Sequence, residues 1–535
     1  MSAVSQEAPL KVNMTRKTTL FTFFTTITML LVSCGQSAVP QDYEIDKSIT
    51  NVKGGAYYEI FVRTFADSDD DGIGDLLGLK DKIDYLEDLG VGGIWLMPIH
   101  PSPSYHGYDV EDYQAINKDY GTLADFSAVI EKAHEADIDV IIDLVINHTS
   151  STHPWFKEGL TNFKAGNFEP NDNANKANWY DFYWDGANVK YEAGFGDWMP
   201  DLNLDNPLVR AEIVNISNFW LDLGVDGFRL DAVTYYYTNQ AQKSIDFLTW
   251  FKGIVRANKE DAYIVGEAWT GQDTINLYYR GIDSLFNFPS ASSGGYIIDN
   301  ITSETGSSFA FRLADTHQKV LAINEDGLVA NFLTNHDMDR SSGMFITNVA
   351  NRQKLAASVY LLTPGIPFIY YGEEIGLKGT RGGAQTDANR RLPMQWQKNI
   401  DPWRTDFPTG TNYNMANQIR EGAFDLLEEP FSLTNHYKKV LSIRNDYPWL
   451  VDARVTQVVL PSSALAALKL TSKDGNESIY VVHNFAATAE TFKLSRLDDQ
   501  KLVIAHDIYT NLERSSINKE ILTLGASSSV VIEKR

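Results

Sequence analysis

Two carboxylic acids in this 535-residue chain each stand directly after a short apolar segment. Asp231 follows Gly227-Phe-Arg-Leu230, and Glu267 follows Tyr263-Ile-Val-Gly266. Two carboxyl groups that flank one bond can break a glycosidic linkage, one by attacking the anomeric carbon and the other by protonating the leaving oxygen. The sequence therefore predicts glycoside cleavage as the chemistry of this pair.

The neighbours of the pair indicate which acid has which role. Arg229 lies two residues before Asp231, so both side chains share one face of a strand. A guanidinium there favours the ionised form of Asp231, as a nucleophile requires. Apolar neighbours and a nearby carboxylate raise the pKa of Glu267, as a proton donor requires. We expect the two carboxyl groups to lie roughly 5–5.5 Å apart, the spacing of a retaining enzyme.

Further polar side chains lie at the ends of other apolar segments of the chain. They are Asp143 with Asn147 and His148, and Asn335 with His336 and Asp337. Several charged groups gathered in one place are costly to bury unless they have a task. We therefore expect these residues to converge with the catalytic pair on one site.

The fold that positions these residues must bring the ends of several strands together. Helix-like segments such as Leu77–Leu89 and Leu123–Ala136 alternate with predicted strands. The eight strands are Ala56–Phe61, Gly93–Met97, Val140–Val145, Gly227–Leu230, Tyr263–Gly266, Ser284–Phe286, Leu328–Leu333 and Pro367–Tyr371. This alternation predicts an α/β fold, a (β/α)8 TIM barrel, in which chemistry sits at the carboxyl ends of the strands.

The barrel accounts for only part of the chain. We predict it over residues 54–146 and 206–448, interrupted at 147–205 by an inserted irregular domain rich in Asn, Asp, Gly, Trp and Tyr. After about Pro448, valine-rich alternating segments such as Ser478–His483 predict an antiparallel β-sandwich over residues 449–535.

Four stretches together resemble the signature regions of the α-amylase family, glycoside hydrolase family thirteen. They are Asp143-Leu-Val-Ile-Asn-His148, Gly227-Phe-Arg-Leu-Asp231, Gly266-Glu-Ala-Trp269 and Asn335-His-Asp337. The resemblance extends from about Tyr57 to Tyr371, and four motifs in the right order at strand ends make it specific. It implies that Asp231 is the nucleophile, Glu267 the acid/base and Asp337 a third catalytic carboxylate that grips sugar hydroxyls.

The resemblance also implies a set of substrate-binding residues. His148 and His336 are expected to hydrogen-bond the sugar in subsite −1, and Arg229 to orient the nucleophile. The stretch His106-Gly-Tyr-Asp109 resembles the family's loop whose tyrosine, here Tyr108, stacks under that sugar. Asp109 and Arg340 are candidates for a pair that closes off a non-reducing end.

Two details narrow the expected specificity. The stretch Met199-Pro-Asp-Leu-Asn203 resembles the corresponding stretches of both oligo-1,6-glucosidases and neopullulanases, and its sequence is intermediate between them. Ala232, a small residue after the nucleophile, favours α-1,4 bonds by the same resemblance. The leading prediction is an endo-acting α-amylase that hydrolyses starch, glycogen and maltooligosaccharides. The alternatives are an exo-acting α-glucosidase or neopullulanase-like hydrolase and, in another class, a catalytically inactive glucan-binding protein.

A candidate metal loop, Asp67-Ser-Asp-Asp-Asp-Gly-Ile-Gly-Asp75, follows the first predicted strand. Oxygen ligands at every second residue, with glycine at the sixth position, are typical of a calcium loop. The expected ligands are Asp67, Asp69, Asp71, Asp75 and the carbonyl of Ile73. Mg²⁺ fits less well because it keeps its waters, so we expect Ca²⁺. The family resemblance agrees with a cation here. The stretch Val233–Tyr237 lacks the Lys-His pair of many α-amylases, which leaves a second calcium beside the insertion open.

Composition restricts the partners and the location. A net charge of −24 opposes binding to nucleic acid or anionic lipid, whereas a neutral glucan is not repelled. Basic Met14–Lys17, apolar Leu20–Val32 and the ending Leu31-Val-Ser-Cys34 predict a lipoprotein signal peptide at 1–33 and lipidation of Cys34. Residues 34–53 would form a tether. We expect an exported monomer, with Cys34 as its only membrane attachment, on an outer membrane or cell surface.

Overall fold

The computed structural model describes residues 55–382, 386–498, 501–511 and 513–535. The predicted signal peptide, the tether and Cys34 lie outside the described residues, and those expectations stay predictions. No helix in the described ranges combines the length and apolar character that a bilayer crossing needs.

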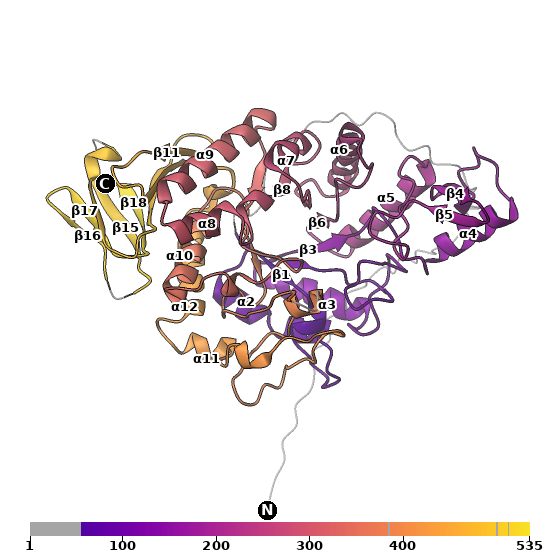
Figure 1. Cartoon of the computed structure of the whole chain (residues 1–535), viewed down its shortest axis with the longest axis horizontal. Helices are drawn as coiled ribbons and strands as arrows, with labels where there is room; N and C mark the ends of the chain where they lie inside the picture. Colours follow the sequence, from indigo (N-terminus) through magenta and orange to yellow (C-terminus); the bar gives the residue numbers. More distant parts are fainter. Residues whose placement is uncertain (1–54, 383–385, 499–500, 512) are drawn as a thin grey trace, which may run out of the picture. The chain divides into compact units, whose positions relative to one another are not determined.

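Eight parallel strands form the central sheet and confirm the predicted barrel (Figure 1). They are β1 (Tyr57–Ile60), β2 (Gly93–Leu96), β3 (Asp139–Leu144), β6 (Gly227–Leu230), β7 (Tyr263–Gly266), β8 (Ser284–Phe286), β9 (Leu328–Ala330) and β10 (Phe368–Tyr370). Their order is β10-β1-β2-β3-β6-β7-β8-β9. A parallel bridge between Phe332, just after β9, and Phe368 in β10 brings the two ends of this order together.

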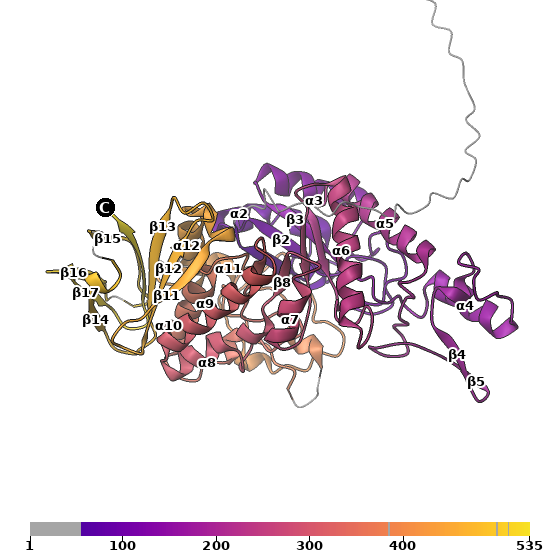
Figure 2. The same cartoon turned by 90° about the horizontal axis from the view of Figure 1, so that it is seen from above.

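Helices follow most of these strands and cover the outside of the barrel (Figure 2). They are α1 (Leu76–Lys80), α2 (Ile83–Leu89), α3 (Leu123–Glu135), α5 (Pro207–Asp222), α6 (Ala241–Asn258), α7 (Gln272–Tyr278), α8 (Tyr296–Ser303), α9 (Gly306–Ile323), α10 (Val349–Leu361), α11 (Ala423–Leu427) and α12 (Leu433–Asn445). Their first residues follow recognisable signals. Thr122 and Asp125 form a capping box before α3, and Asn206 caps α5 with Pro207 in its first turn.

The segment Leu77–Leu89, expected as one helical stretch, is divided between α1 and α2. The division lies beside Lys82, whose side chain is 1% exposed. Its ammonium lies 2.8 Å from the centroid of the Trp403 ring and 4.9 Å from that of Trp396. A contact with a segment more than three hundred residues away therefore accompanies the break, and helical periodicity alone does not reveal it.

The insertion after β3 has more regular structure than its composition suggests. It holds helix α4 (Pro154–Ala165) and a hairpin of β4 (Phe182–Asp185) and β5 (Asn188–Tyr191). The insertion has an aromatic centre in which Trp179 and Tyr180 are each 2% exposed, whereas Trp184 and Trp198 are more than half exposed. Isolated antiparallel bridges join His148 to Asp201 and Tyr180 to Leu202, so both ends of the insertion return to the barrel mouth.

The C-terminal region consists of two antiparallel sheets, as expected for a sandwich. Its strands are β11 (Arg454–Val458), β12 (Leu465–Thr471), β13 (Ser478–Asn484), β14 (Glu490–Lys493), β15 (Leu502–Ile508), β16 (Ser516–Asn518), β17 (Ile521–Leu524) and β18 (Ser529–Lys534). The orders are β11-β12-β13-β18-β15 and β14-β17-β16. Leu465, Val482, Leu522 and Val530 belong to a buried apolar cluster that both sheets share. Helix α9 packs against β11 and β12 (Figure 2).

Candidate active site

Three neighbouring strands bring the proposed catalytic residues together. In the pairing of β3 with β6, Asp143 lies opposite Arg229, and in the pairing of β6 with β7, Leu230 lies opposite Gly266. Asp231 and Glu267, the next residues along β6 and β7, therefore leave the sheet side by side. This is the carboxyl end of the barrel, where the βα connections gather.

The Arg229 guanidinium joins three carboxylates at this end. Its Nη1 donates to both oxygens of Asp143 at 2.8 and 2.9 Å and to Oδ1 of Asp231 at 2.8 Å. Its Nη2 lies 3.0 Å from Oε2 of Glu267. The arginine is 1% exposed, so these charge-assisted contacts form away from water and hold both proposed catalytic acids on one cation.

Each acid of the pair has one oxygen fixed by the protein. Oε2 of Glu267 also accepts from the backbone N–H of Ala232 at 3.0 Å. In the described part of the chain, no protein donor is recorded for Oδ2 of Asp231 or Oε1 of Glu267. One carboxylate oxygen of each acid thus remains available for a substrate.

Burial and charge separate the pKa values of the two acids. Burial raises the pKa of Glu267 to about 7; Arg229 opposes this shift, and Asp231 adds to it. Burial also raises the pKa of Asp231 to about 6, against the opposing effect of Arg229. Arg229 therefore limits the increase in the pKa of Asp231 but does not abolish it. The order of the two values, with Glu267 the weaker acid, suits a proton donor and a nucleophile.

A second network centres on His336, whose two ring nitrogens both have protein partners. Nδ1 lies 2.6 Å from Oε1 of Glu59, while Nε2 lies 3.0 Å from Oδ2 of Asp337 and 2.8 Å from the Tyr108 hydroxyl. Burial alone would lower the pKa of His336, but the Asp337 and Glu59 carboxylates outweigh it and raise the pKa to about 9. The ring is therefore an imidazolium that donates from both nitrogens at neutral pH.

Tyr108 connects this network to the first one. Its hydroxyl donates to Oδ2 of Asp143 at 3.0 Å, and its ring stacks on His336 with centroids 5.4 Å apart. The Arg229 guanidinium lies 5.8 Å from the Tyr108 ring centroid. The structure therefore brings Tyr108, His336 and Asp337 to the same barrel mouth as the carboxylate pair.

Two residues of this site were not among the residues singled out from the sequence. Arg391 donates from Nη2 to Oδ1 of Asp337 at 2.7 Å. Burial alone would raise the pKa of Asp337, but the His336 and Arg391 cations outweigh burial and hold the pKa of this carboxyl well below its usual range. Glu59 is a buried acid within the apolar strand β1. A lone charged residue in such a strand is a detectable signal, whereas nothing in the local sequence distinguishes Arg391.

The remaining substrate-binding candidates have partners within the protein. His148 donates from Nε2 to the carbonyl of Tyr108 at 3.1 Å, and Nδ1 of His106 accepts from the Tyr108 N–H at 3.2 Å. Asp109 accepts from Ser102 and Ser104, and Arg340 donates to the carbonyls of Tyr371 and Arg390. The proposed Asp109–Arg340 pair is thus not a formed contact in this structure.

Exposed aromatic rings follow both proposed catalytic acids in the sequence. Tyr235, four residues after Asp231, is 43% exposed and packs on Phe195 with ring centroids 4.7 Å apart. Phe195 also lies 5.3 Å from the His148 ring. Trp269, two residues after Glu267, is 52% exposed and stacks on Phe288. These rings can present flat apolar faces to sugars outside the central subsite.

The acidic loop after β1 gathers three of its carboxylates. Ligand oxygens of Asp67, Asp69 and Asp71 lie within 4.8 Å of one another. The pKa of Asp69 is raised by partial desolvation and then by the neighbouring Asp71 carboxylate, as expected where anions crowd together. Asp75 instead accepts from Ser68 and from the Gly78 N–H as the N-cap of α1, and Ile73 donates its N–H to Asp71. The three-carboxylate cluster suits a hard cation such as Ca²⁺.

Comparisons with known proteins agree with this geometry. The family model described as alpha amylase, catalytic domain, matches residues 59–453. Alpha-amylase 3 of Dictyoglomus thermophilum is 38% identical over 491 residues, which cover 90% of this chain and 93% of the relative. Among solved structures, Eubacterium rectale Amy13B has a TM-score of 0.84 at 37% identity and covers 90% of this chain and 95% of its own. The alpha-amylase from H. orenii has a TM-score of 0.79 at 33% identity, covering 90% and 99%. Other relatives are named oligo-1,6-glucosidase and 4-alpha-glucanotransferase.

Proposed function

Since the chain belongs to the α-amylase family of glycoside hydrolases and acts on α-glucans, we propose that it is an endo-acting α-amylase. Its proposed substrates are the α-1,4 bonds of starch, glycogen and maltooligosaccharides. The observation that carries the endo assignment is the exposure of Trp269, two residues after Glu267, and of Tyr235 and Phe195, which pack together beside His148. A chain that continues past the central subsite can stack on these rings, whereas an enzyme limited to chain ends has no need of them.

The proposed mechanism uses the two carboxylate oxygens that the protein leaves available. Glu267, protonated, gives its proton to the glycosidic oxygen while Asp231 attacks the anomeric carbon from the opposite face. The C–O bond to the leaving chain breaks, and a covalent glycosyl-enzyme forms on Asp231. Glu267, now ionised, takes a proton from water, and that water displaces Asp231 to release an α-configured product. Asp337 is placed to hold sugar hydroxyls because His336 and Arg391 keep it ionised.

The proposed preference for α-1,4 bonds rests on Ala232. Its backbone has a φ of 50°, in the left-handed region, and its N–H contacts Glu267. Its side chain, next to the proposed nucleophile, is a single methyl group. A small residue there leaves room beside the attacking carboxylate, which the resemblance associates with α-1,4 cleavage.

We also propose calcium in the loop after β1. Asp67, Asp69 and Asp71 would supply carboxylate oxygens, and the Ile73 carbonyl and Asp75 would complete the set. Asp75 would then share its oxygens between the cation and its cap of α1. The cation would neutralise the mutual repulsion of the loop and stabilise it. It would have no part in bond cleavage.

The remaining proposals concern the whole chain. We also propose export, lipid anchoring at Cys34 and a monomeric state, with domain boundaries at 1–33, 34–53, 54–146 with 206–448, 147–205 and 449–535. The sequence supports the anchor through its Leu-Val-Ser-Cys ending.

Analysis of products on amylose, pullulan and panose tests the proposed function. An endo-acting enzyme releases mixed maltooligosaccharides from amylose early in the reaction, and NMR should show α-configured reducing ends first. Glucose as the sole early product would instead establish the exo-acting α-glucosidase. Preferred cleavage of pullulan would favour the neopullulanase-like reading, and binding of amylose without any product would indicate an inactive glucan-binding protein.

A further inference from the structure

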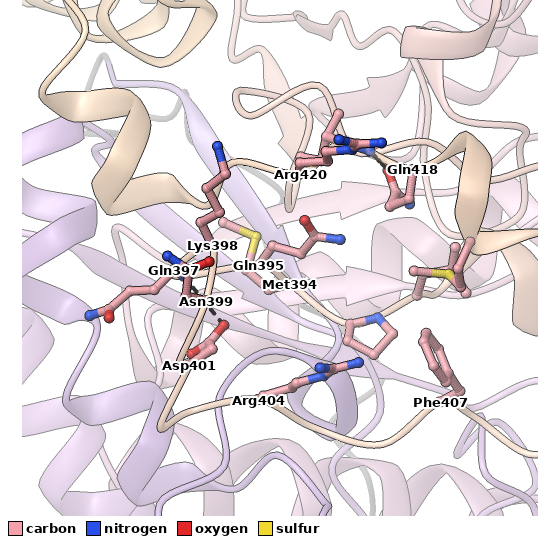
Figure 3. A pocket seen from close by; sticks show the side chains of 14 residues that line it. Met394, Gln395, Gln397, Lys398, Asn399, Asp401, Arg404, Phe407, Gln418 and Arg420 are labelled. Carbon is pink, nitrogen blue, oxygen red and sulfur yellow. Dashed lines mark hydrogen bonds between the residues drawn. The ribbon is translucent and has the colours of Figure 1, made fainter.

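A cavity of about 380 Å³ lies outside the residues assigned to catalysis (Figure 3). It is formed by residues between Leu392 and Arg420, in the long connection from β10 to α12. None of the catalytic, subsite or metal-loop residues described above lines it. Its volume is within the range of small-molecule sites and exceeds what one inorganic anion fills.

The lining of this cavity combines an apolar platform with planar polar groups. Phe407 and Met415 are 40% and 38% exposed and supply apolar surface. Figure 3 shows Phe407 and Arg404 on one side of the cavity, Gln418 and Arg420 on the other, and Gln395 between them. In the described residues, no protein partner is recorded for the side chains of Gln395, Arg404 or Arg420.

The walls of the cavity are held in place before any ligand arrives. The Asp401 carboxylate accepts from the backbone N–H groups of Trp396 and Trp403 at 2.9 and 3.1 Å. The backbone of Lys378 fixes the side-chain amide of Gln418. The Lys378 N–H donates to Oε1 of Gln418, and the Lys378 carbonyl accepts from Nε2. A wall fixed in this way loses little conformational entropy on binding.

The positions of the charged side chains argue against a single anion as the occupant. Arg404 and Arg420 stand on opposite sides of the cavity and so do not converge on one point (Figure 3). The third cation of the lining, Lys398, is paired with Glu421 at 3.0 Å, and Asp401 adds a carboxylate. The chain as a whole carries a net charge of −24. An uncharged ligand with many hydroxyl groups fits this lining better.

We propose that this cavity is a second α-glucan binding site, separate from the catalytic cleft. A glucose unit would place its C–H face on Phe407, while Gln395, Arg404 and Arg420 hydrogen-bond the hydroxyls at its edge. The connection that forms the cavity leaves the carboxyl end of β10, so it starts on the face of the barrel where catalysis occurs. The site would hold a polysaccharide near the cleft and raise its local concentration. The choice of ligand rests on the proposed function.

Phe407→Ala tests the site through affinity electrophoresis in gels containing amylopectin, with kcat/KM on maltotriose measured in parallel. We expect retardation by amylopectin to weaken about five- to tenfold, the cost of removing an anchoring aromatic ring, while kcat/KM on maltotriose stays unchanged. Gln395→Ala should weaken retardation in the same direction. Phe311→Ala removes an equally bulky ring that is 61% exposed on α9 and is the matched control.

Unchanged retardation of both cavity variants would overturn the proposal. Phosphate that raises the melting temperature of the wild type but not of Arg404→Ala, with retardation unaffected, would identify an anion site and overturn it as well. Because maltotriose turnover and amylose products are scored separately, a wrong endo assignment would leave this binding result intact.

Discussion

Arg229 contacts three buried carboxylates at once, and these contacts influence the protonation of both proposed catalytic acids. With Glu267 protonated, the formal charges of Glu59, Asp143, Asp231 and Asp337 exceed those of Arg229, His336 and Arg391 by one. In the proposed mechanism, this excess negative charge would stabilise the oxocarbenium-like transition state of glycoside cleavage.

Substitutions of the two acids should differ in kind. Glu267→Gln should lose about 10²- to 10⁴-fold in kcat on starch, because it keeps the nucleophile but has no proton to give. It should still react with an α-maltosyl fluoride, which needs no protonation, and then accumulate a covalent adduct visible by mass spectrometry. Asp231→Ala should be inactive on both substrates. Release of a β-configured product by the wild type would contradict the assignment of Asp231.

The pH profile follows from the pKa values of the same pair. Above about pH 7 Glu267 loses its proton, and below about pH 6 Asp231 gains one, so kcat/KM on maltotriose should fall on both sides of a narrow optimum. With the fluoride substrate the alkaline fall should disappear while the acid fall remains. An alkaline fall that persists with the fluoride would show that another group causes it.

Ala232→Val should raise the ratio of panose cleavage to maltotriose cleavage, because a branched side chain narrows the space beside Asp231. The left-handed φ of 50° at Ala232 adds a structural cost, since a β-branched residue is strained there by about 1–2 kcal/mol. Ala232→Gly is the control that widens the site without strain. If panose cleavage does not rise in a valine variant that remains folded, the linkage assignment fails.

At the scale of elements, the loop after β1 connects to a distant segment. The N–H of Asp67 donates to the carbonyl of Trp403, and the N–H of Asp406 donates to that of Gly72, at 3.1 and 2.7 Å. A cation held by the loop would therefore stabilise residues 403–407 together with the loop.

Chelation should lower the melting temperature, because it removes a ligand that binds only the folded state. Asp69→Ala and Asp71→Ala should have the same effect and should no longer respond to chelator. Asp70→Asn removes an equal charge at a residue outside the three-carboxylate cluster and should still respond. Differential scanning calorimetry with and without added calcium measures this. If chelator leaves the melting temperature of the wild type unchanged, the proposed calcium site is excluded.

The barrel strands were predictable because buried parallel strands are short apolar runs with clear ends. The strands ending before Asp231 and Glu267 have the predicted bounds, and β9 ends three residues earlier than expected. The polar ends of those strands, with the family motifs, also indicated most of the residues that the structure brings together at the barrel mouth. Arg391 and the second cavity belong to the connection after β10, which has no periodic pattern. Their positions depend on tertiary contacts such as Arg391 with Asp337, which no local signal encodes.

At the scale of the whole molecule, membrane attachment and catalysis are proposed to depend on different parts of the chain. Cys34→Ala should abolish membrane association while the released protein keeps its activity on starch, because the proposed catalytic groups and their partners all lie from residue 59 to residue 391. Cell fractionation with an activity assay measures both. A membrane fraction that is unchanged in the variant would refute lipidation at this cysteine.

The insertion between β3 and β6 also has a consequence for how the active site comes into being. Asp143 and Arg229 touch across adjacent strands although they are 86 residues apart in the sequence. Loop closure costs only about 0.6 kcal/mol for each doubling of loop length, so the insertion has little effect on equilibrium stability. It does affect folding kinetics, because such long-range pairings form slowly. The pairing of β3 with β6, which positions Asp231, should therefore form late in folding, and a partly folded chain would lack the proposed catalytic site.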